Sequence, residues 1–110
     1  MTKIDIITTS GLTAGDGSIL ESGATIKFGS EFMAASTDIK IKPMVYRNRE
    51  LFDAGYQNVP IPEEIIPYDF VLSIPEEEFY VLTPAALYQE VCDYLNTLIP
   101  DMFEVKIITE

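Results

Sequence analysis

Apolar and polar residues alternate in several short stretches of the chain, which is the pattern of half-buried β-strands. The stretches with this period of two are 3–9, 24–33, 39–45, 68–74 and 103–109. Pro43 has no backbone N–H to donate to a neighbouring strand. We therefore expect four to five strands, and we expect the third stretch to be an edge strand or to be broken at Pro43.

One late segment has helical spacing instead. Its apolar residues recur three or four positions apart, at Leu87, Val91, Tyr94, Leu95 and Leu98. Thr83 suits an N-cap, Pro84 suits the first helical position, and Pro100 ends the segment. We predict a helix over 84–98 that turns Leu87, Val91, Leu95 and Leu98 toward the sheet. A turn or short helical piece that ends at Gly55 is expected at 50–55, and a short helix is expected at 75–82.

This order of elements predicts an α+β fold in a single domain that spans 1–110. We expect a mainly antiparallel β-sheet, with the late helix packed on one face or end before a final strand. A β-sandwich that carries a helical insertion between its last two strands fits the same pattern. The sequence leaves these two arrangements open.

Residues 10–23 hold four glycines and few apolar residues, so a long glycine-rich loop is predicted there. Loops of this length in compact domains are usually functional. Leu12, Ile19 and Leu20 are its possible apolar anchors, and ordering each residue costs roughly 1–2 kcal/mol of backbone entropy. We therefore expect the loop to be mobile in the isolated domain and to be held by a neighbouring chain through Leu12, Ile19 or Leu20.

The chain carries 18 acidic and 7 basic residues, a net charge of −11. This charge repels nucleic acid, so we expect no nucleic-acid partner. The apolar runs are too short to span a membrane, and Asp5 interrupts the apolar stretch that a signal peptide needs, so an intracellular origin is expected. The single cysteine, Cys92, lies beside the apolar stripe of the predicted helix, where we expect a packed core thiol.

The chain contains no histidine. This excludes Ser–His and Cys–His nucleophile pairs and histidine-ligated metal sites. The glycine-rich loop lacks the lysine of a phosphate-binding loop, and the ligand spacing of an EF-hand is absent. Carboxylates are abundant, but nothing singles out a pair for acid–base catalysis. We expect a protein without catalytic, cofactor-binding or metal-binding residues.

Aromatic and arginine residues near the strand with Pro43 point to binding instead. Tyr46, Arg47 and Arg49 lie together there, and both residue types are enriched at the centres of protein interfaces. The candidate partner-binding residues are therefore Leu12, Ile19, Leu20, Tyr46, Arg47 and Arg49.

Two segments resemble a known class of proteins. Residues 36–39 and 46–56 read Ser-Thr-Asp-Ile and Tyr-Arg-Asn-Arg-Glu-Leu-Phe-Asp-Ala-Gly-Tyr, and residues 76–84 read Glu-Glu-Glu-Phe-Tyr-Val-Leu-Thr-Pro before the helix. In their order these segments resemble small structural proteins of tailed bacteriophages of gut Bacteroidetes, crAss-like phages included. The similarity covers 36–56 and 70–98.

The resemblance implies a non-enzymatic virion component that is made in the host cytoplasm. Such a protein assembles in many copies with other virion proteins at the neck, tail or capsid surface, and it forms a homo-oligomer within the assembly. An alternative from the charge alone is an acidic inhibitor or DNA mimic that occupies a basic groove on a host protein. A small carboxylate-based hydrolase is the third hypothesis, and it requires a concave pocket with a carboxylate pair.

Overall fold

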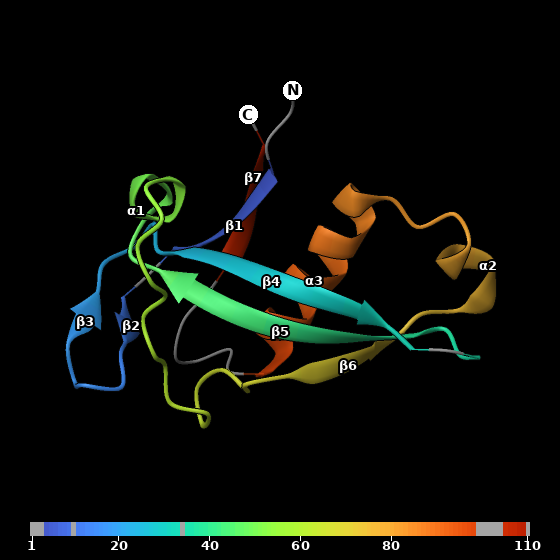
Figure 1. Cartoon of the computed structure of the whole chain (residues 1–110), viewed down its shortest axis with the longest axis horizontal. Helices are drawn as coiled ribbons and strands as arrows, with labels where there is room; N and C mark the ends of the chain where they lie inside the picture. Colours follow the sequence, from blue (N-terminus) through green and yellow to red (C-terminus); the bar gives the residue numbers. More distant parts are fainter. Residues whose placement is uncertain (1–3, 10, 34, 99–104, 110) are drawn as a thin grey trace.

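The computed structural model describes residues 4–9, 11–33, 35–98 and 105–109 (Figure 1). The strands are β1 (Ile4–Thr8), β2 (Leu12–Thr13), β3 (Ile19–Leu20), β4 (Thr25–Phe32), β5 (Asp38–Tyr46), β6 (Phe70–Ser73) and β7 (Val105–Thr109). The helices are α1 (Arg49–Asp53), α2 (Glu76–Phe79) and α3 (Pro84–Leu98). The start of the last predicted strand at 103–104 and the predicted helix stop at Pro100 lie outside the described residues.

The strands confirm the predicted α+β fold. Five of them form one antiparallel sheet in the order β6-β5-β4-β1-β7, while β2 and β3 form a separate hairpin. Of the two arrangements that the sequence left open, the structure has the antiparallel sheet with a helix on one face, together with the small β2–β3 sheet. Ile6 lies opposite both Ile26 and Ile107, and Ile26 lies opposite Val45, so this register gathers apolar side chains on the face under the helix.

Pro43 lies where β5 has lost one of its neighbours. The strand pairs with β4 along its whole length but with β6 only over Asp38–Ile41. Beyond that point the one further contact is an isolated bridge between Val45 and Val59. The edge expected at Pro43 therefore exists locally, although β5 is an internal strand of the sheet.

Helix α3 begins as its sequence predicts. The Thr83 hydroxyl accepts a hydrogen bond from the Ala86 N–H at 3.2 Å, and the Thr83 carbonyl accepts one from the Leu87 N–H at 3.0 Å. Thr83 is thus the N-cap, and Pro84 is the first helical residue. These local signals fix the start of the helix independently of the sheet on which it packs.

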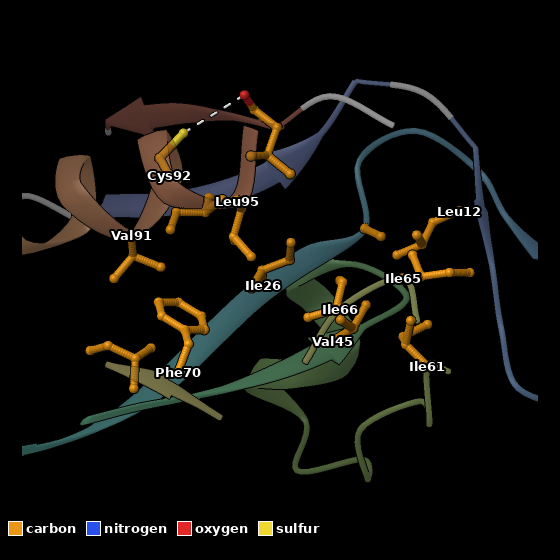
Figure 2. Close-up of a cluster of buried hydrophobic side chains, with 14 of the residues drawn as sticks. Leu12, Ile26, Val45, Ile61, Ile65, Ile66, Phe70, Val91, Cys92 and Leu95 are labelled. Carbon is orange, nitrogen blue, oxygen red and sulfur yellow. Dashed lines mark hydrogen bonds between the residues drawn. The ribbon is translucent and has the colours of Figure 1, made fainter. Parts of the chain in front are cut away.

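One face of α3 packs on the sheet and closes the core. Val91, Cys92 and Leu95 are buried, and the Tyr94 ring stacks on Phe70 at 4.2 Å between centroids. Leu87 and Leu98, which were also expected on this face, are partly buried against the same core. Figure 2 shows Cys92 within this cluster, with its thiol donating to the Val105 carbonyl oxygen at 3.7 Å. The prediction of a packed core thiol is confirmed.

The core extends past α3 to the other end of the sheet. There the connection between α1 and β6 packs against the β2–β3 hairpin, with Ile61, Ile65 and Ile66 close to Leu12 and Val45 (Figure 2). A single apolar core therefore links the helix, the sheet and the hairpin.

Candidate functional site

The glycine-rich stretch is folded onto its own domain. Leu12 pairs with Leu20 across the hairpin, and both side chains are buried, with 2% exposed. Ile19 points outward and is 68% exposed. The prediction that these residues bind a neighbouring chain is therefore wrong for Leu12 and Leu20, because the domain's own core supplies the apolar contacts that local sequence does not reveal.

Polar contacts complete the hairpin. The Gly15 N–H donates to the Pro60 carbonyl at 2.9 Å, which ties the turn to the connection before β6. The Ser18 hydroxyl and backbone N–H both donate to Asp16, and they lower the pKa of its carboxyl. Gly17 takes a positive φ of 88°, which favours glycine at this turn. The hairpin is thus closed by contacts within the chain.

Two of the three residues proposed near Pro43 have internal contacts. The Tyr46 ring packs against Phe52 at 4.9 Å between centroids. Arg49 forms ion pairs with Asp5 and Asp53, and hydrogen bonds to Asp53 and then Asp5 raise the pKa of its guanidinium. Arg47 is exposed. The structure therefore does not bring the six predicted partner-binding residues together, and it leaves only Ile19 and Arg47 exposed.

A buried carboxylate explains the position of Arg49. Asp5 is 2% exposed, and its two oxygens contact Lys27 and Arg49. The Lys27 ammonium also lies 4.9 Å from the centre of the Phe52 ring. Asp5 thus joins β1, β4 and α1 through ion pairs that the sequence analysis did not predict. The signal it missed is the position of Asp5 between two isoleucines of a central strand.

The exposed apolar surface gathers at a different place. Four large side chains are exposed there, and we call them the distal patch: Phe32, Met33, Tyr80 and Val81. They lie at the end of β4 and just after α2, which Figure 1 shows near one another on the right. The Phe79 ring contacts both Phe32 and Tyr80, at 5.9 and 5.5 Å between centroids, so it joins the two parts of the patch.

A hollow of about 370 Å³ adjoins the distal patch. Its floor comes from β4, and its wall comes from the residues that lead into α3 and from the first turns of that helix. The lining residues are Phe28, Ser30, Phe32, Leu82, Thr83, Pro84, Leu87 and Tyr88. Within this lining, Phe28 packs against Tyr88 at 4.8 Å between ring centroids. Such a mostly apolar hollow suits apolar side chains better than charged groups.

The described residues show no second candidate site of a different chemical kind. They include no cluster of three or more cysteine, aspartate or glutamate residues placed to hold a metal ion. Within the same residues, no helix combines the length and apolar character needed to cross a membrane. The candidate site is therefore the distal patch with its adjoining hollow, and neither was identified from the sequence.

Comparison of the chain with known protein families, curated proteins and solved structures finds no match.

Proposed function

We propose that this protein is a non-enzymatic structural component of a phage virion, assembled in multiple copies with other virion proteins at the neck, tail or capsid surface. The observation that supports a binding function is the distal patch. Tyr80 and Val81 are 75% and 73% exposed, beside the exposed Phe32 and Met33. Contiguous exposed apolar groups of this kind mark surfaces that other proteins cover. The assignment to a virion rests on the resemblance of 36–56 and 70–98.

The test compares particles that carry the normal protein with particles that carry Tyr80→Ser. Quantitative mass spectrometry of purified particles should find the normal protein at a fixed ratio to the other structural proteins. Tyr80→Ser should lower its incorporation at least about tenfold, because exposed aromatic anchors carry much of the binding energy of an interface. Absence of the normal protein from particles would refute the virion assignment.

Tyr56→Ser is the matched control. Tyr56 is 63% exposed, close to the value for Tyr80, and it lies just after α1, away from the patch residues in sequence. We expect its incorporation to stay normal. Equal losses for the two variants would show that the distal patch is not the assembly surface.

The second candidate function is an acidic inhibitor or DNA mimic. Five exposed glutamates favour it, in the connection before β6 and on α2: Glu63, Glu64, Glu76, Glu77 and Glu78. A mimic should bind a basic nucleic-acid enzyme more weakly as salt rises, and Glu63→Gln with Glu64→Gln should weaken that binding further. The same pair of substitutions should leave incorporation into particles unchanged if the first proposal holds.

A further inference from the structure

Strand β4 has a neighbour on both sides for only a short part of its length. It pairs with β5 over Thr25–Phe32, but with β1 only at Thr25 and Ile26. Figure 1 shows the cause, since β1 and β7 diverge from β4 while β4 and β5 continue together toward α2. Among the described residues, the stretch Phe28–Phe32 therefore has an open edge on the side that β1 has left.

The backbone groups of alternate residues point to this open edge. The Ala24 carbonyl accepts a hydrogen bond from the Thr8 N–H, so the backbone of Ala24 faces β1. Because strand backbone groups alternate sides, those of Phe28, Ser30 and Phe32 face the same way. Within the described chain no backbone partner engages these three residues there. The edge thus presents a row of unpaired donors and acceptors to an added strand.

The hollow lies alongside the open edge. The side chains of Phe28, Ser30 and Phe32 lie on the face of the sheet that α3 covers, because their ladder partners include the buried Ile39 and Ile41. They line the hollow together with the first turns of α3. An added strand would lie roughly 4.8 Å from β4, with every second side chain on the α3 face. Alternate apolar side chains of that strand would therefore enter the hollow.

The charges at the end of this edge select the chemistry of the added strand. Helix α2 contacts Phe32 through Phe79 and carries the exposed carboxylates of Glu76, Glu77 and Glu78. None of these carboxylates forms an ion pair with a described residue. A second copy of the chain would bring a further net charge of −11 to this surface. A basic segment of a different protein is electrostatically complementary to it.

We infer that the open edge of β4 at Phe28–Phe32 is a strand-addition site for a basic, extended segment of a different protein, whose alternate apolar side chains fill the hollow beside α3. Main-chain hydrogen bonds would supply affinity, and the hollow would select the side chains. This inference rests on the proposed binding function, and it names the form of the partner and where it binds.

The direct test uses short synthetic peptides of about six residues, the usual length of a strand. The first peptide alternates valine with lysine. The second has the same composition, with all valines placed before all lysines. The third has the sequence of the first, with N-methylated amides along one edge of the strand. Only the first peptide, which alternates and is not methylated, should slow amide exchange at Phe28, Ser30 and Phe32. Exchange at Gly29 and Glu31, whose backbones face β5, should not change. Failure to bind at millimolar concentration, or equal binding of all three peptides, would overturn the inference.

A proline at Ser30 tests the same edge from the protein side. Ser30→Pro removes the N–H that faces the open edge and leaves the pairing with β5 intact, because proline is tolerated on the open side of an edge strand. Ser30→Ala keeps the N–H and is the matched control. We expect the proline variant to bind the alternating peptide about tenfold more weakly than the alanine variant. Equal affinities, in variants with equal thermal stability, would refute strand addition.

The outcomes separate this inference from the proposed function. Peptide binding at the edge by a protein that is absent from particles would refute the virion assignment alone. Normal incorporation of Ser30→Pro into particles would refute strand addition alone. Self-association of the chain through β4, abolished by Ser30→Pro, would show that the occupant is a second copy and would overturn the choice of a basic partner.

Discussion

The buried Asp5 carboxylate provides the sharpest test of how this fold is held together. Asp5→Ala would remove the group that joins β1 to Lys27 on β4 and to Arg49 on α1. The carboxylate is almost inaccessible, whereas the side chains of Lys27 and Arg49 remain 14% and 26% exposed. The substitution therefore leaves two largely desolvated cations without their shared partner.

Removing one partner of a buried ion pair costs about 3–5 kcal/mol. Water can still reach both cations in part, so we expect a value near the lower end, about 3 kcal/mol. A domain of this size has a free energy of unfolding of about 5–15 kcal/mol. The loss should therefore be a large fraction of the stability, and it should be visible as a lower midpoint in urea denaturation followed by circular dichroism.

Asp53→Ala is the control, because Asp53 is the other carboxylate on Arg49 and its side chain is 48% exposed. Exposed ion pairs four residues apart in a helix contribute about 0.3–0.5 kcal/mol, so this variant should lose less than about 1 kcal/mol. High salt should weaken the Asp53 contribution and leave most of the Asp5 contribution, since buried pairs are screened less. Equal losses for the two variants would refute the central role of Asp5.

Three further predictions test the core, the thiol and the hairpin. Leu95→Ala should cost about 2–5 kcal/mol in urea denaturation, because Leu95 is 1% exposed, and a cost under about 0.5 kcal/mol would contradict its burial. Burial, and secondarily the charge of Asp93, raise the pKa of the Cys92 thiol above its ordinary value of 9.0. The free energy of unfolding should therefore fall as pH rises above 9.0, and Cys92→Ala should make this fall smaller. Amide exchange in the monomer should be slow at Ala14 and Gly15, because their N–H groups donate to the Ser18 and Pro60 carbonyls. Fast exchange at both residues would instead support the prediction of a mobile loop at 10–23.

The parts of the fold that sequence reasoning predicted are those with local causes. The N-cap at Thr83, the proline after it and the apolar spacing that follows all act within a few residues, and α3 forms where they place it. The five strands of the main sheet follow in the same way from their period of two, whereas β2 and β3 lie in the stretch 10–23, for which a loop was predicted. Local patterns therefore predicted α3 and the five strands of the main sheet. The order of these helical and strand segments was enough to predict an α+β fold.

The errors have nonlocal causes. The stretch 10–23 contains few apolar residues, but Leu12 and Leu20 are buried because the connection at 61–66 packs against them from far along the chain. The charges of Asp5 and Arg49 are 44 residues apart and meet only when α1 folds onto the sheet. The distal patch was missed for the same reason, since it joins the end of β4 to the end of α2.

The open edge of β4 differs in sequence from the other open edges of the sheet, and this difference supports a binding partner at β4. Where β5 lacks β6, it carries Pro43, and the outer strand β7 carries Lys106. The other outer strand, β6, is only four residues long. Proline, lysine and a short strand all discourage pairing with another chain. The open half of β4 has neither proline nor lysine, and it is bounded by Phe28 and Phe32, with its one charge, Glu31, on the face away from α3. An edge without such protection invites association. Its position beside a hollow of about 370 Å³ makes a specific added strand the consistent explanation for leaving it open.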